Sequence, residues 1–175
     1  LELLITLSIT AILFALATPG FSSLISNSRV SSSLSSLEKI LKLARIEALT
    51  HQSSVIICGT DNDSACSQST FWERGYMSFL DTKNLGRPSQ KDVDQQLIQL
   101  VQEQPENTSI RLSGPKDHIR FNSTGSAFEH NGTLWICDDR GEKFAKGIFV
   151  TPVGLIRSAK DSDEDGIINI NDSEN

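Results

Sequence analysis

The chain has 175 residues, which is room for one domain with an elongated appendage but not for two full-sized domains. Its apolar content of 38% and charged content of 22% are typical of a folded protein and exclude a chain that is disordered throughout. The formal charge is −6, and residues 161–175 supply six of the acids and no base, which leaves 16 acids against 16 bases in residues 1–160. The acidity therefore belongs to a C-terminal tail.

Residues 3–18 form an uncharged apolar segment. A helix of that length covers about 24 Å, slightly less than the ~30 Å hydrocarbon core of a bilayer. We expect residues 1–21 to be a helix half that inserts into a membrane or a filament core. A secretory signal peptide is the alternative, but a basic leader before the segment and a small-residue cleavage pattern after it are both missing. Because the chain starts without Met, we interpret Leu1 as a processed or trimmed terminus.

Pro19 and Gly20 follow this segment. We expect a kink or local unwinding there, because proline removes a helical hydrogen bond. Apolar residues at spacings of three and four then predict an amphipathic helix over residues 22–51 that packs on a head domain. A helix over residues 1–51 would be about 75 Å long, too long for the remaining chain to cover. Its first half must contact lipid or neighbouring subunits.

After His51 the pattern changes to short β-type runs separated by turn residues. Residues 82–107 are polar and contain one helix-like piece, Val93–Val101, which we interpret as a surface excursion between sheet segments. The predicted fold class is α+β, with a long N-terminal α-helix packed against an antiparallel β-sheet head at residues 52–160 and an acidic tail at residues 161–175. The predicted strands are 54–58, 75–80, 118–121, 133–137, 147–151 and 154–158.

Two of the three cysteines, Cys58 and Cys66, flank a turn-rich insert. They predict a small disulfide loop in an oxidising exterior, with reduced cytosolic thiols as the alternative. Cys137 ends an apolar run that begins at Thr133, and we interpret it as a buried, unreactive thiol in a strand.

Glu2 is a carboxylate beside an uncharged apolar helix, which is costly in a membrane unless something neutralises it. The alternative is a simple interfacial acid. The string Leu1 to Ile9, with Pro19 after the apolar run, resembles the N-terminal segment of type IV pilins and type II secretion pseudopilins. The resemblance implies cleavage by a prepilin peptidase, N-methylation, and pairing of Glu2 with the N-terminal ammonium of a neighbouring subunit.

The head resembles the GspH/FimT group of minor pilins. Its matching residues include Trp72, Phe121, the string Cys137 to Gly141, and Gly154 to Arg157. The resemblance implies a single-pass inner-membrane protein with a periplasmic head, which assembles with other pilins and initiates or caps a type IV pilus, with possible assistance to DNA uptake. A type II secretion pseudopilin and a membrane-anchored calcium-binding module are the alternatives.

DNA-binding members of this group carry a Gly-Arg-x-Arg element in the C-terminal hairpin. The matching positions here are Gly154-Leu155-Ile156-Arg157, so one arginine is kept and one is replaced. A basic edge for phosphates would then consist of Arg157, Lys160, Lys143 and Lys146. Solvated surface bases are the alternative, and the acidic tail beside them opposes DNA binding.

The acidic tail has the spacing of an EF-hand-type loop, with Gly166 at the turn. Alternating carboxylates at this spacing can wrap oxygens around Ca²⁺, although Asp172 is shorter than the usual glutamate at the closing position. A disordered acidic tail is the alternative. The candidate ligands are Asp161, Asp163, Asp165, Ile167, Asn169 and Asp172.

The sequence does not favour an enzyme. The three histidines, His51, His118 and His130, are scattered, and we find neither a nucleophile motif nor a phosphate-binding glycine loop. We expect no required cofactor.

Overall fold

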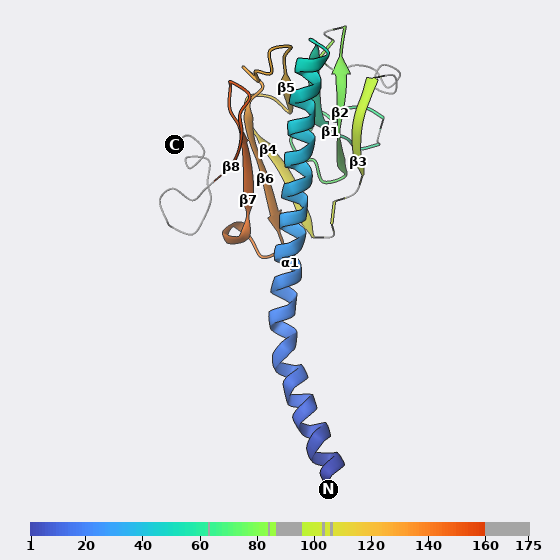
Figure 1. Cartoon of the computed structure of the whole chain (residues 1–175), viewed down its shortest axis with the longest axis vertical. Coiled ribbons are helices and arrows are strands. Elements are labelled where there is room, and N and C mark those ends of the chain that lie inside the picture. The colour runs from blue at the N-terminus through green and yellow to red at the C-terminus, as the bar shows by residue number, and fades with distance from the viewer. Residues whose placement is uncertain (63, 84, 87–95, 103, 106, 160–175) are drawn as a thin grey trace.

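The computed structural model describes residues 1–62, 64–83, 85–86, 96–102, 104–105 and 107–159, with residues 13–20 and 102 described without their side chains. Helix α1 (Glu2–Thr50) is followed in this part of the chain by a β-rich head (Figure 1). The predicted α+β class is confirmed. The strands are β1 (Ser54–Gly59), β2 (Gly75–Asp81), β3 (Leu97–Gln102), β4 (Thr108–Ser113), β5 (His118–Phe121), β6 (Gly132–Asp138), β7 (Lys146–Val150) and β8 (Ile156–Ser158), with a short 3-10 helix, η1 (Glu142–Phe144), between β6 and β7.

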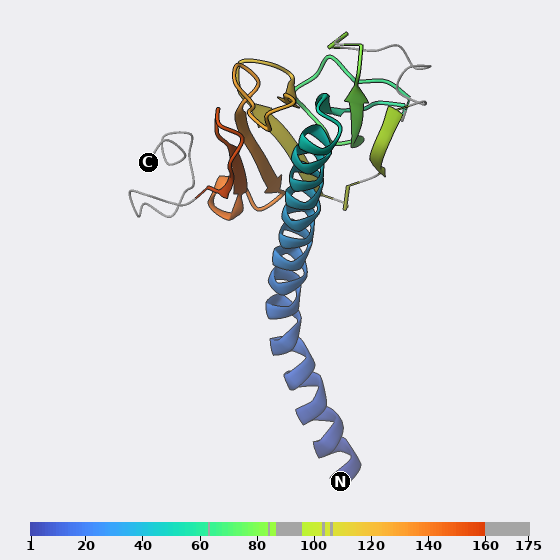
Figure 2. The same ribbon diagram turned by 45° about the horizontal axis from the view of Figure 1, so that its top comes forward.

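Helix α1 is one continuous element of 49 residues, about 74 Å long at the usual rise. Its backbone remains helical through Pro19 and Gly20, so the prediction of local unwinding there is wrong. A proline costs one backbone hydrogen bond, and a long helix can accommodate that loss by bending rather than by ending. Figures 1 and 2 show a gently curved helix whose N-terminal half projects away from the head.

The head contains two antiparallel four-stranded sheets rather than one continuous sheet. Their strand orders are β3-β2-β1-β5 and β4-β6-β7-β8. The C-terminal half of α1 contacts strands of both sheets and lies across the junction between them (Figure 2). Residues 70–72 also connect the sheets, because the amide of Trp72 donates to Ile110 of β4 and the amide of Leu112 donates to Thr70.

The main core lies between α1 and the two sheets. The buried residues of α1 recur at helical spacing, as the sequence predicts, so that one stripe of the helix faces the head. From the sheets, alternate residues of each strand meet this stripe, such as Val55 and Ile57 of β1 and Leu134 and Ile136 of β6. The buried residues of α1 are Val30, Ser33, Leu37, Ile40, Leu41, Ala44 and Ala48.

A smaller core covers the opposite face of the first sheet. Ile56 and Cys58 of β1 pack there with Met77 and Phe79 of β2. The predicted disulfide is confirmed, because Cys58 and Cys66 are bonded with their Cα atoms 5.6 Å apart. Cys66 also packs against this small core.

The structure corrects the prediction of a helix-like piece at Val93–Val101. Residues 93–95 lie outside the described residues, and Leu97–Gln102 form strand β3, paired antiparallel with β2. The register shifts between Ser78 and Phe79, so that Ile98 is an extra residue in β3. Ile98 and Val101 both pack against the main core, and this spacing of three imitates a helical pattern.

Candidate assembly interface

The N-terminal part of α1 presents an apolar surface that the rest of the described chain does not cover. All seven large aliphatic side chains in residues 1–12 are between 51% and 95% exposed. Phe21, Leu24 and Ile25, nearer the head, are also exposed. So many large apolar side chains exposed on one helix indicate a site of protein or membrane contact. The side chains in residues 1–12 are Leu1, Leu3, Leu4, Ile5, Leu7, Ile9 and Ile12.

The hydroxyl groups on this segment make hydrogen bonds within the helix. Thr6 Oγ1 donates to the carbonyl of Leu3 at 3.0 Å, Ser8 Oγ donates to that of Leu4 at 2.8 Å, and Thr10 Oγ1 donates to that of Thr6 at 2.6 Å. A polar group that enters an apolar environment must have its hydrogen bonds satisfied. These three residues therefore do not prevent burial of the segment.

Glu2 is the charged side chain on this segment, in the first turn of α1. It is exposed, and the described residues offer it no hydrogen-bond or ion-pair partner. The amides of the first helical turn favour a negative charge at this position, but only partly compensate for its desolvation. If the segment is buried in an assembly, Glu2 requires a cation from another molecule.

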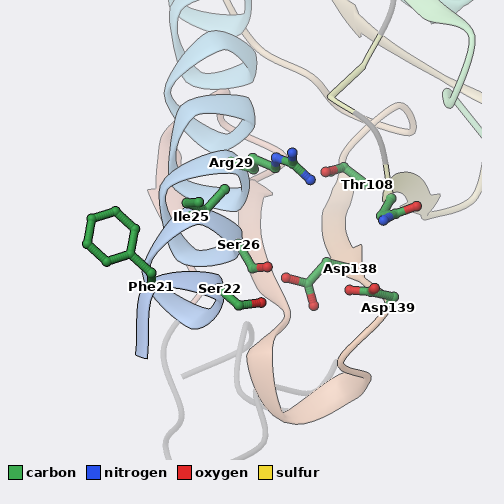
Figure 3. A pocket seen from close by; sticks show the side chains of 9 residues that line it. Phe21, Ser22, Ile25, Ser26, Arg29, Thr108, Asp138 and Asp139 are labelled. Carbon is green, nitrogen blue, oxygen red and sulfur yellow. The ribbon is translucent and has the colours of Figure 1, made fainter. Parts of the chain in front are cut away.

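A groove lies where α1 leaves the head (Figure 3). It has a volume of about 400 Å³, with one wall from the helix and the other from β4 and the end of β6. Figure 3 shows Ser22 and Ser26 turned toward Asp138 and Asp139. The groove is polar and adjoins the exposed apolar surface. Its lining residues are Phe21, Ser22, Ile25, Ser26, Arg29, Asn107, Thr108, Asp138 and Asp139.

Arg140 fixes the base of the head to the helix. Its Nη2 donates to Asp138 Oδ2 at 2.6 Å, its Nη1 donates to Asn27 Oδ1 of α1 at 2.9 Å, and its guanidinium lies 4.2 Å from the ring centre of Phe144. The hydrogen bonds from Arg140 lower the pKa of Asp138. The sequence does not predict this role of Arg140, because Asn27 lies 113 positions away and no local pattern joins the two.

Lys146 makes a second polar link to α1. Its Nζ donates to Ser31 Oγ at 2.8 Å, and it shares the inner face of β7 with the buried Ile148 and Val150. Arg157 of β8 pairs with Phe149 of β7 and is therefore on the opposite face, exposed to solvent. The structure thus separates two of the predicted DNA-binding residues.

Of the other predicted site residues, Lys143 is exposed in η1, whereas Lys160 and all six candidate calcium ligands lie outside the described residues. Gly154 of the hairpin element forms the turn before β8, and Leu155 is 40% exposed beside it. Cys137 is half-buried in β6, and burial together with Glu142 and Asp138 raises the pKa of its thiol. The predicted position in a strand is confirmed, but the thiol is half-buried rather than buried, and its lack of reactivity stays a prediction.

The family described as Type II transport protein GspH matches residues 34–154, which include most of the head and the packed half of α1. The chain belongs to the GspH family. No curated protein matches the chain significantly.

Two solved structures share the fold of this GspH family member. Both are crystal structures of the type IV minor pilin FimU from Pseudomonas aeruginosa strain PAO1, in space groups P21 and P65. The first aligns with a TM-score of 0.58 at 15% identity, over 78% of this chain and 92% of FimU. The second aligns with a TM-score of 0.55 at 14% identity, over 77% of this chain and 94% of FimU. The pilin-like fold is therefore shown.

A search of the described residues for a helix with the length and hydropathy of a membrane span finds none.

Proposed function

We propose that this GspH family member is a minor pilin that assembles into a type IV pilus through the N-terminal half of α1. The main support is the exposed apolar surface of residues 1–12, whose hydroxyls are satisfied and whose carboxylate has no partner in the described chain. Burial among the helices of neighbouring subunits would remove this surface from water, at about 25 cal/mol for each Å². Pairing of Glu2 with the terminal ammonium of a neighbour would neutralise both charges.

In this proposal the protein has a structural role and no catalytic one. Residues 1–21 reside in the inner membrane before assembly, with the head in the periplasm, and a prepilin peptidase processes the N-terminus. The subunit then initiates or caps the filament and contacts other pilins through α1. Assistance to DNA uptake would depend on the exposed Arg157 and on Lys143.

The decisive experiment compares Glu2→Ala with Glu38→Ala in a deletion strain. Glu38 is a matched control, because it is an acid on the same helix that makes only an exposed pair with Lys42 at 2.6 Å. We expect both proteins to accumulate in the membrane fraction, but only Glu38→Ala and the wild type to appear in sheared filaments. Normal incorporation of Glu2→Ala would contradict the role of Glu2, whereas absence of the wild type itself from sheared filaments would contradict the proposal and favour the membrane-anchored calcium-binding module.

A type II secretion pseudopilin is the second candidate, and the description of the matching family favours it. The two roles predict different phenotypes for a deletion. Loss of pili, twitching and transformation with normal secretion would support the minor pilin, whereas loss of exoprotein secretion with normal pili would support the pseudopilin.

A further inference from the structure

The rings of two histidines, His118 and His130, lie against each other on the face of the first sheet that is turned away from α1. His118 begins β5 and pairs directly with Cys58 of β1, and His130 lies in the connection between β5 and β6. Their ring centres are 4.8 Å apart, with an angle of 39° between the ring planes. The pair has no part in the assembly interface.

Both rings carry a buried nitrogen without a hydrogen-bond partner, His118 Nε2 and His130 Nδ1. His118 is only 9% exposed, and its Nδ1 lies 2.8 Å from Asp117 Oδ1. A carboxylate oxygen can only accept, so Nδ1 of a neutral His118 carries the proton and Nε2 carries the lone pair. A buried lone pair without a partner is unfavourable, and an electrophile beside it would relieve this cost.

We propose that His118 Nε2 and His130 Nδ1 together bind a transition-metal ion of the copper, nickel and zinc class. Imidazole nitrogen is the ligand that these ions share. The hydrogen bond from His118 to Asp117 is the outer contact that orients a metal-binding histidine and raises its basicity. This proposal is independent of pilus assembly.

Water supplies the remaining ligands in this proposal, because the described residues contain no group of three or more histidine, cysteine and acidic side chains placed to bind a metal. His130 borders a hollow of about 180 Å³ that Arg120, Asn122 and Glu129 also line and His118 does not, so such waters would reach the ion from the side of His130. Water molecules in open coordination positions are common in sites with few protein ligands.

The charges around the pair predict a modest affinity. Burial lowers the pKa of His130, with further contributions from His118, Arg120 and Lys116. The positive charges of Arg120 and Lys116 would also repel a metal ion. Arg120 is partly compensated, because its Nη2 donates to Ser54 Oγ at 3.0 Å and lies 3.8 Å from Asp81 Oδ2.

The test uses the full chain in detergent, with Cys137→Ser in every variant so that the free thiol neither binds nor reduces the probe. Cu²⁺ is titrated at pH 7 and followed by calorimetry and electron paramagnetic resonance. We expect one Cu²⁺ per chain with hyperfine splitting from two nitrogens. His118→Ala and His130→Ala should each weaken binding at least tenfold, and Asp117→Asn about tenfold.

His51 provides the matched control, because it is exposed at the end of α1, where its Nε2 lies 3.1 Å from Glu47. His51→Ala should bind Cu²⁺ as the parent does. Unchanged binding in His118→Ala or His130→Ala would overturn the proposal. If those variants fail to fold, the parent spectrum still decides, because a signal with fewer than two nitrogen ligands, as carboxylates would give, also overturns it.

Discussion

Gly154 packs so closely against Gly125 that a Cβ atom at position 154 would overlap the carbonyl oxygen of Gly125. The same oxygen accepts a hydrogen bond from Arg45 Nε of α1 at 3.1 Å. Gly154 and Gly125 have φ angles of 80° and 73°, which L side chains rarely adopt. The glycine of the hairpin element is therefore a structural contact among α1, the β5–β6 connection and the turn before β8.

This contact predicts that Gly154→Ala destabilises the head strongly. Alanine adds about 1 kcal/mol of backbone strain at a positive φ angle. Its Cβ atom would also force the turn at position 154 away from the turn at Gly125. We expect the free energy of unfolding to fall by about 3 kcal/mol, measured by chemical denaturation.

Gly86→Ala separates the two contributions. Gly86 also has a positive φ angle, 73°, but an added Cβ atom there would meet nothing within 4 Å. We expect a loss of only about 1 kcal/mol, from strain alone. Equal losses in the two variants would show that the contact with Gly125 is not important for stability.

Arg140→Ala should loosen the base of the head from the helix. The change removes the hydrogen bonds from Arg140 to Asp138 and Asn27. The side chain of Asp138 is only 5% exposed, so its carboxylate would be left buried without the guanidinium that now pairs with it. Hydrogen bonds to charged groups contribute roughly 1.5–3 kcal/mol, and we expect a loss in this range. Lys42→Ala is the control, because its pair with Glu38 is exposed and should contribute at most about 0.5 kcal/mol.

The same pair predicts a dependence of stability on pH. Arg140 lowers the pKa of Asp138 in the folded chain below the ordinary value of 3.8. A depressed carboxyl pKa stabilises the fold above the unfolded pKa, and this contribution is lost as the pH falls through the folded pKa. The stability difference between wild type and Arg140→Ala should therefore be constant above about pH 5 and shrink below pH 4. A difference that does not change with pH would contradict this assignment.

Much of the fold could be predicted from the sequence, because its signals are local. The stripe from Leu37 to Ala48 and the strand at 118–121 follow directly from apolar periodicity. β4 escaped prediction although the burial of Thr108–Ser113 alternates, because only Ile110 and Leu112 of its six residues are large and apolar. β3 was misread because its bulge at Ile98 breaks the period of two that identifies a strand.

The sites were less predictable, because they depend on contacts between distant residues. Glu2 is identifiable since a single acid in an apolar segment is a local signal. By contrast, the four bases 143, 146, 157 and 160 are close in sequence, yet the pleat of the sheet directs Lys146 to the helix and Arg157 to solvent. The contact between the rings of His118 and His130 depends on the path of the chain from β5 to His130, which no spacing rule predicts.

The disulfide should contribute substantially to the stability of the head. Cys58 and Cys66 are eight positions apart, and closing a loop of this length is expected to contribute about 2–3 kcal/mol by restricting the unfolded chain. Reduction should lower the denaturation midpoint by a corresponding amount. Cys137→Ser should behave as the wild type under both conditions, and a midpoint that reduction leaves unchanged would contradict the prediction.

The placement of the bases predicts which variants change DNA binding, if the head binds DNA. Arg157→Ala should weaken binding to DNA of every base sequence, because one exposed phosphate contact is lost. The slope of log affinity against log salt concentration should fall by about 1. Lys146→Ala should leave the slope unchanged, because its ammonium is held by Ser31 on the face turned to α1. Gel shifts with double-stranded DNA at two salt concentrations provide the measurement.

Leu155→Arg offers the complementary test on the same hairpin. Leu155 is 40% exposed at the position where DNA-binding relatives carry an arginine, so the new side chain can reach solvent without disturbing the core. If the hairpin contacts phosphates, this change should tighten binding and increase the salt slope by about 1. Equal changes in Lys146→Ala and Arg157→Ala would show instead that binding follows net charge, and no shift in any variant, Leu155→Arg included, would exclude the hairpin as a DNA contact.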